Sequence, residues 1–133
     1  MSKLYPYLFV FSIEKGLVRE NGNEYEAIRK FWYKIDKWQY CSDMYAIGLV
    51  QGNAICAFKI DEWKLIENKN VEARYEFSGK EINDSELLHK NWKKIIELAK
   101  GYWGFGGWLV VSLNENNQFR ILRGSHDNEW HEF

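Results

Sequence analysis

Aromatic side chains are the groups in this sequence with the clearest chemical potential. Seven Trp, eight Tyr and eight Phe make up 17% of the 133 residues. The core of a domain this size needs only part of these rings, so we expect the remainder at a surface or in a pocket. Trp and Tyr stack on flat ligands, nucleobases above all. The composition therefore favours a binding site lined by aromatic rings.

One group of candidate binding residues recurs at helical spacing. Tyr25, Arg29 and Trp32 are spaced by four and three residues, which places them on one side of a helix. They are candidates to contact a ligand. The alternative is that the two rings anchor the core, while Arg29 lies at its edge with its charge in water.

A second group of candidates lies in a glycine-rich stretch. Residues 101–108 alternate glycines with aromatic residues (GYWGFGGW), and glycine allows a backbone to approach a ligand closely. Trp103 and Trp108 are the candidates from this stretch. Trp63 follows two acidic residues in a predicted strand, and we expect it at the rim of the same pocket. Rings from two such places would enclose a flat base and would favour its methylated form.

Catalytic motifs are missing from the sequence. It contains no phosphate-binding loop, no dinucleotide-binding glycine motif and no zinc-protease motif. The glycines of 101–107 follow a predicted helix and precede a strand, which is the reverse of a helix-dipole phosphate site. Asp61, Glu62 and Glu76 are available for acid–base work, but carboxylates are common on exposed strand faces. We therefore expect no enzymatic activity.

Metal ligands are sparse as well. His126, Asp127 and His131 lie in a polar terminal segment with no matching cluster elsewhere. Cys41 and Cys56 are too few for a disulfide scaffold, and Cys56 reads as a small core residue. We expect no metal and no cofactor.

The charge balance limits how the protein can bind a polyanion. The net charge is -1 and the isoelectric point is about 6.3, so no global field attracts the protein to nucleic acid. A local patch would have to supply the backbone contacts, and its candidates are Lys30, Lys34, Arg120 and Arg123. No apolar run reaches the length of a membrane helix and no secretory signal is evident, so we expect a cytoplasmic protein without a membrane partner.

The elements that must position these residues follow from hydrophobic patterning. A hairpin over 44–66, with a turn at Gln51-Gly52-Asn53, and a third strand over 73–79 organise the chain. The apolar run 5–13 predicts a central strand buried on both faces. Two further strands are predicted over 108–113 and 118–123.

Two helices are predicted to pack outside this sheet. Asn23 is a fair cap for the first, which lies within 24–38 as one helix or as a short helix followed by an irregular turn. Residues 16–23 read as a loop. Asn83 is the predicted cap of the second helix, which ends at Gly101. The fold class is α+β, a small curved sheet or β-barrel with two main helices, in one domain (1–124) followed by a polar tail (125–133).

Four short motifs occur in an order that resembles a known superfamily. They are 23–32 (NEYEAIRKFW), 45–52 (YAIGLVQG), 58–64 (FKIDEWK) and 74–80 (RYEFSGK). Together they resemble the PUA-like superfamily, in particular its EVE/YTH-type branch and small domains associated with restriction and defence systems. The resemblance covers roughly residues 5–82.

The resemblance implies a small β-barrel whose pocket receives a flipped-out, often methylated base of DNA or RNA. It implies that Tyr25, Arg29 and Trp32 lie at the edge of the pocket and that Ser12 lies at the end of the first strand. Lys30 stands where a small residue is usual, which would narrow the pocket. The stretch 101–108 has no counterpart in the pattern.

We therefore expect a non-catalytic domain that recognises a modified nucleobase in DNA or RNA through an aromatic pocket. Two alternatives stay open: a pocket that sequesters a signal, such as a free nucleotide or other flat ligand, and a protein-interaction domain that uses surplus aromatic residues. The sequence leaves the oligomeric state open. The expected base-binding residues are Ser12, Tyr25, Arg29, Trp32, Trp63, Trp103 and Trp108.

Overall fold

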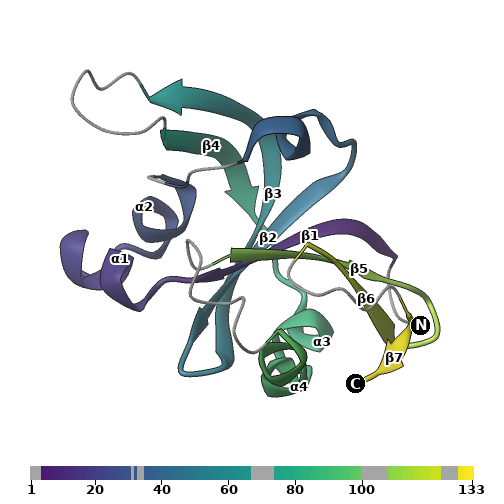
Figure 1. Cartoon of the computed structure of the whole chain (residues 1–133). Helices are drawn as coiled ribbons and strands as arrows, with labels where there is room; N and C mark the ends of the chain where they lie inside the picture. The colour runs from purple at the N-terminus through teal and green to yellow at the C-terminus, as the bar shows by residue number, and fades with distance from the viewer. Residues whose placement is uncertain (1–3, 31, 33–34, 67–73, 100–107, 124–128) are drawn as a thin grey trace.

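Seven strands form one mixed sheet in the order β4-β3-β2-β1-β5-β6-β7 (Figure 1). The computed structural model describes residues 4–30, 32, 35–66, 74–99, 108–123 and 129–133. The strands are β1 (Tyr5–Ser12), β2 (Met44–Val50), β3 (Asn53–Ile66), β4 (Arg74–Glu81), β5 (Trp108–Leu113), β6 (Gln118–Arg123) and β7 (His131–Glu132). The α+β class predicted from the sequence is confirmed.

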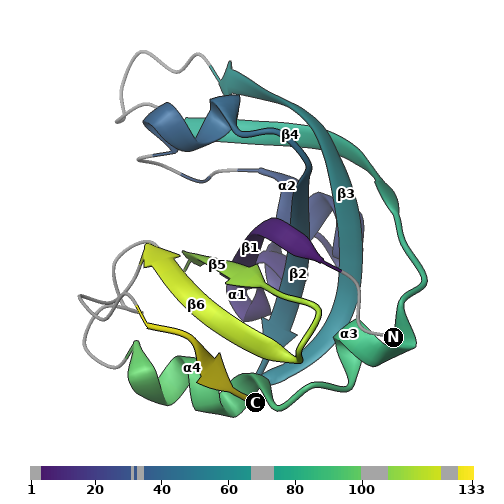
Figure 2. The same ribbon diagram turned by 90° about the vertical axis from the view of Figure 1, so that its right-hand side faces the viewer.

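The sheet is strongly curved but it does not close into a barrel (Figure 2). Among the described strands, β4 and β7 form the two edges and do not pair with each other. The barrel alternative is therefore wrong, and the curved-sheet alternative is the one observed. The residues at the end of the expected polar tail join the sheet, because β7 pairs with β6 and Phe133 packs on Phe119 and Trp92.

The strand β1 lies at the centre of the sheet and is buried on both faces, as predicted. It pairs in parallel with β2 and antiparallel with β5. Successive side chains of a strand point to opposite faces. Leu8 and Val10 accordingly enter one core and Phe9 and Phe11 enter the other, all fully buried.

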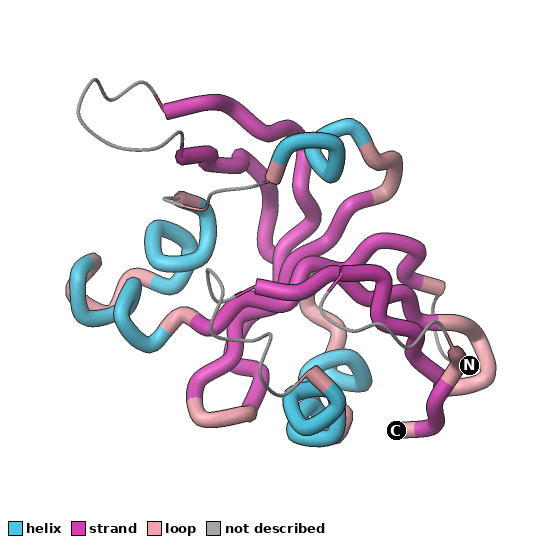
Figure 3. The backbone as a smooth tube through the Cα atoms, in the orientation of Figure 1, coloured by secondary structure: helices cyan, strands magenta, loops and turns pink. Residues whose placement is uncertain are grey.

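Short helices cover both faces of the sheet (Figure 3). Side chains from α3 (Ser85–Leu88) and α4 (Trp92–Leu98) complete the core that contains Leu8. The opposite core, which contains Phe9, is completed from α1 (Glu14–Arg19), α2 (Glu24–Arg29) and the 3-10 helix η1 (Asp36–Tyr40). None of the helices in the described residues is both long and apolar enough to cross a membrane.

The helix α1 occupies a segment predicted in part to be a loop. Gly16 is the first residue of the predicted loop, but it lies inside the helix and is buried. A Cβ at this position would lie 2.8 Å from the backbone oxygen of Ala27. Gly16 therefore serves the close approach of α1 to α2, and the loop prediction for 16–23 is wrong at its N-terminal end.

The helix α2 ends early, which is the short-helix alternative. Asn23 caps it as predicted, because its side chain accepts a hydrogen bond from the Glu26 N–H at 3.0 Å. Lys30 then adopts an extended conformation. Trp32 forms an isolated bridge with Tyr75, which ties the following segment to β4.

The second predicted helix is divided in two. Asp84, rather than Asn83, caps α3 by accepting from the Leu87 N–H at 3.1 Å. The chain leaves the helix after Leu88 and re-enters it at Trp92, whose indole N–H donates to the Leu87 carbonyl at 3.0 Å. In the described residues, four short α-helices and one 3-10 helix thus replace the two main helices expected.

The hairpin turn between β2 and β3 lies within the predicted residues. Gln51 and Gly52 take the positive φ angles, 53° and 80°, and Asn53 already begins β3. Two successive positive φ values are the geometry that suits a tight hairpin.

Gly79 offers a test of the β3–β4 packing. A Cβ on Gly79 would lie 2.0 Å from the backbone oxygen of Lys59, so Gly79→Ala should lower the free energy of unfolding by about 3 kcal/mol. Gly22→Ala is the control, because a Cβ there meets nothing within 4 Å and only the positive φ of 84° is penalised, at about 1 kcal/mol. Urea denaturation of both variants measures the difference, and equal losses would contradict the close approach.

Candidate functional site

An open pocket lies between the start of α2 and the strands β3 and β4. Its volume is about 520 Å³, within the range of small-molecule sites. We call it the Tyr25 pocket. The described residues that line it are Gly22, Asn23, Glu24, Tyr25, Phe58, Gly79 and Glu81.

Local structure fixes the Tyr25 side chain. The cap by Asn23 sets the start of α2 and places Tyr25 in its first turn. The Tyr25 hydroxyl accepts a hydrogen bond from the Gly79 N–H at 3.2 Å. The ring centroids of Tyr25 and Phe58 are 5.3 Å apart and their planes are tilted by 43°, a favourable arrangement for two rings. Tyr25 is thus held by both β3 and β4.

The Tyr25 pocket carries negative charge. Glu24 and Glu81 line it, and its described lining residues include no Lys, Arg or His. The same negative charge acts on the neighbouring Cys56. Burial raises the pKa of its thiol to about 12, and the carboxylates of Glu24 and Glu81 contribute to the rise. At neutral pH this thiol is therefore uncharged.

Arg29 lies beside the pocket and is engaged by two carboxylates. Its guanidinium pairs with Glu26 at 3.2 Å and with Glu76 at 3.1 Å, and its Nε donates to the Phe77 carbonyl at 3.1 Å. Its Cζ lies 5.5 Å from the centroid of the Tyr25 ring, within the range of a cation–π contact.

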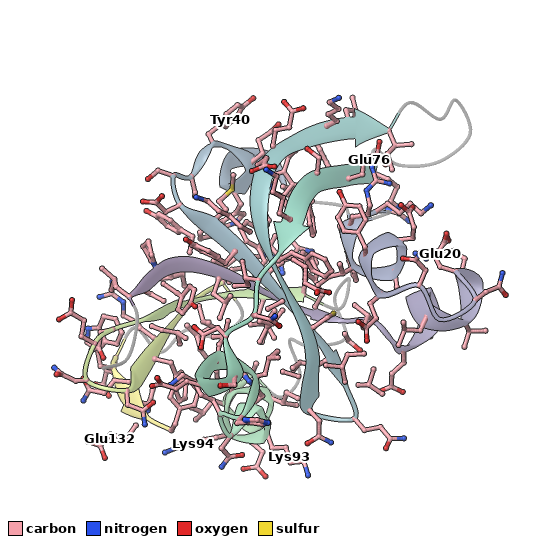
Figure 4. The ribbon with its side chains drawn as sticks, turned by 180° about the vertical axis from the view of Figure 1, so that it is seen from behind. Glu20, Tyr40, Glu76, Lys93, Lys94 and Glu132 are labelled. Atoms are coloured by element: carbon pink, nitrogen blue, oxygen red, sulfur yellow. The ribbon has the colours of Figure 1, made fainter. Side chains whose placement is uncertain are left out.

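Lys30, a predicted contact for a nucleic-acid backbone, is also engaged. Its ammonium lies 2.9 Å from Glu26 and 3.1 Å from Glu20, and these hydrogen bonds lower the pKa of both carboxyls and raise that of Lys30. Figure 4 shows Glu20 and Glu76 on the side of the molecule that carries α2, whereas Lys93 and Lys94 lie on α4. A phosphate would have to compete with these ion pairs for Lys30.

Three other predicted binding residues belong to a buried cluster. We define the ring cluster as Phe9, Phe11, Trp32, Trp63, Phe77 and Trp108. Trp108 is fully buried, Trp63 is 8% exposed, and Trp32 is half-buried. Trp32 stacks on Phe11 with centroids 4.4 Å apart, and its indole N–H donates to the Ile28 carbonyl at 2.6 Å. These three rings do not line the Tyr25 pocket in the described structure; each packs on Phe9 or Phe11.

Ser12 lies in a different pocket. This second pocket, of about 410 Å³, lies between the ends of β1 and β2, the β2–β3 turn and α4. Its described lining consists of Ser12, Glu14, Leu49, Gln51, Gly52, Lys93, Ile96 and Glu97. The structure therefore brings Tyr25 and Arg29 together, and it separates Ser12 from them.

The remaining predicted positions divide between β6 and undescribed segments. Arg123 lies over the Trp108 ring, with its Cζ 3.4 Å from the centroid, and donates to the Trp108 carbonyl at 2.6 Å. Arg120 packs over the ring of Trp130. Trp103 and Lys34 lie outside the described residues. The described residues hold no group of three or more His, Cys, Asp or Glu arranged to bind a metal.

Several residues of the Tyr25 pocket escaped the sequence interpretation. Glu24, Phe58 and Gly79 lie within the motifs of the resemblance but were not predicted to line the pocket, and Glu81 lies outside those motifs. The signal that joins them is the β3–β4 register, which pairs Phe58 with Glu81. That register contains a bulge between Ile60 and Glu62, and a bulge shifts the faces of all residues beyond it.

Comparison with known proteins gives no assignment. No protein-family model, curated protein or solved structure significantly matches this chain. The PUA-like resemblance accordingly stays a prediction, and the candidate site depends on the geometry described above.

The indole N–H of Trp63 generates a further test. It is buried without a hydrogen-bond partner among the described residues, a situation that costs about 1–3 kcal/mol. Trp63→Phe removes this donor together with part of a packed ring. Trp92→Phe makes the same substitution at a buried indole that is hydrogen-bonded to Leu87. We expect Trp63→Phe to cost about 1–2 kcal/mol less than Trp92→Phe in urea denaturation. A greater loss at Trp63 would show that its N–H is satisfied.

Proposed function

We propose that this domain binds a nucleobase in modified form, without catalysing a reaction on it, and that the Tyr25 pocket holds the base. The observation that carries the proposal is a pocket of base-binding size in which the rings of Tyr25 and Phe58 lie beside oxygen acceptors of Asn23, Glu24 and Glu81. Rings provide stacking and apolar contact, and side-chain oxygens read the N–H groups on the edge of a base. Tyr25 is also one of the three residues, with Arg29 and Trp32, that the resemblance implies at the pocket edge.

Binding is a better fit than catalysis because of what lines the pocket. Its described lining residues contain no Ser, Thr, Cys, Lys or His, so the hydroxyl, thiol, amine and imidazole nucleophiles of these side chains are missing there. The pocket instead presents rings and acceptors that are held in place by α2, β3 and β4.

A free nucleoside or similar flat ligand is a second candidate, and the ion pairs favour it. Arg29, the last residue of α2, and Lys30, which follows it, are both engaged by carboxylates. Contacts to phosphates normally require available Lys and Arg, and they make affinity steeply dependent on salt. Affinity in the Tyr25 pocket would then come from the base itself.

The positions of the aromatic residues give little support to the alternative of a protein-interaction domain. The two cores take up most of the described rings, contrary to the expectation that many would lie at a surface. Among the large hydrophobic side chains that are exposed in the described structure, the aromatic ones are Tyr40 and Trp130.

The substitution Tyr25→Leu tests the proposed function. Nucleosides and short DNA or RNA strands with plain or methylated bases would be titrated by calorimetry at low and high salt. Loss of one stacking ring should weaken binding by about tenfold or more, since a base–aromatic stack contributes about 1–3 kcal/mol. Tyr40→Leu is the matched control, because Tyr40 is 82% exposed and lies outside the pocket.

The outcomes separate the possible ligands. Binding to strands that falls steeply with salt identifies a nucleic-acid reader, whereas binding to nucleosides with little salt dependence identifies a free ligand. Equal weakening by Tyr25→Leu and Tyr40→Leu would exclude the Tyr25 pocket. An absence of binding to every nucleoside and strand would overturn the proposal. Urea denaturation of both variants shows whether Tyr25→Leu remains folded under the binding conditions.

A further inference from the structure

Two carboxylates in the Tyr25 pocket differ from their neighbours on α1, α2 and β4. Glu20, Glu26 and Glu76 each form an ion pair with Arg29 or Lys30. Glu24 and Glu81 have no ion-pair partner among the described residues, although both line the pocket. The local cations thus compensate the carboxylates outside the pocket and leave those inside it uncompensated.

The backbone fixes the positions of these two residues. Glu24 is the first residue of α2, whose start is fixed by the Asn23 cap. Glu81 ends β4 and pairs with Phe58 in the β3–β4 ladder. The two acidic residues therefore reach the pocket from two elements that are tied together by the hydrogen bond between Tyr25 and Gly79.

The negative charges of Glu24 and Glu81 act on the same part of the protein. Both carboxylates oppose ionisation of the same buried Cys56 thiol, in addition to the larger effect of its burial. The nearby cation, Arg29, does not cancel this field, because Glu26 and Glu76 already pair with it. The contact of its guanidinium with the Tyr25 ring also shows that this ring is a surface against which a planar cation packs.

We propose, as an extension of the proposed function, that the Tyr25 pocket selects a positively charged base: a purine or pyrimidine alkylated on a ring nitrogen, in preference to its neutral counterpart. Alkylation of a ring nitrogen that carries no hydrogen leaves the ring flat and gives it a delocalised positive charge. A cation is attracted to the π face of Tyr25. Its remaining N–H groups donate charge-assisted hydrogen bonds to Glu24 and Glu81.

Isomeric methylated nucleosides separate charge from methylation. 1-Methyladenosine is cationic at neutral pH, whereas its isomer N6-methyladenosine is neutral, and 3-methylcytidine and 5-methylcytidine form a second such pair. Each would be titrated by calorimetry at pH 7, as the nucleoside and within a short strand. We expect the cationic isomer of each pair to bind at least about tenfold more tightly, as one charge-assisted contact contributes about 1.5–3 kcal/mol.

Charge-neutralising variants test the assignment to these two residues. Glu24→Gln and Glu81→Gln should each reduce the preference for the cationic isomer by about fivefold, and the double variant should abolish it. Glu97→Gln is the control, because Glu97 is exposed and lines the other pocket. It should leave both affinities unchanged.

The results distinguish the two proposals from each other. Equal affinity for both isomers of both pairs would overturn the selection of cations and leave the proposed function intact. A preference for the cation that survives in the double variant would overturn the role of Glu24 and Glu81. Failure of all nucleosides and strands to bind would overturn both proposals.

Discussion

The alternation of side chains along β1 is the constraint on which the rest of the structure depends. Phe9 and Phe11 fill the core beneath α2, and Leu8 and Val10 fill the core beneath α4. Each fully buried side chain contributes about 1.5–3 kcal/mol through removal of apolar surface from water. A shift of one residue in the register of β1 would exchange both sets, so the two cores fix this register jointly. The helices and the outer strands are positioned by those cores, and the Tyr25 pocket lies at their margin.

The strand pattern could be predicted because it depends on local periodicity. β1 reads as a continuous apolar run, the β2–β3 turn contains a glycine, and Asn23 provides a cap before a helical pattern. The helices were harder because tertiary contacts override local signals. Gly16 looks like a break in isolation, but it is buried against Ala27. The segment around Lys90 has helical periodicity, yet the helix divides where the Trp92 indole takes the Leu87 carbonyl as its acceptor.

The candidate site was predictable only in its helical part. Tyr25 lines the pocket and Arg29 lies next to it, both on α2, whose spacing can be read from the sequence. Glu81 lines the pocket because it pairs with Phe58 in the β3–β4 ladder. That ladder contains a bulge, and no sequence pattern predicts its register. The positions of the Trp residues could not be predicted, for another reason. Composition shows that rings are abundant, but it does not show that Trp32 and Trp108 stack with phenylalanines inside the protein.

The parallel pairing of β1 with β2 has a consequence for folding. Parallel neighbours require a long crossover, and here it spans residues 13–43 and includes α1, α2 and η1. Tyr25 lies within this crossover, and its hydroxyl contacts Gly79, 54 residues further along the chain. Contacts between distant residues form late, because closing large loops costs entropy before it is rewarded. The Tyr25 pocket therefore requires the crossover and β4 to be in place together, so it is a product of long-range folding and not of one local segment.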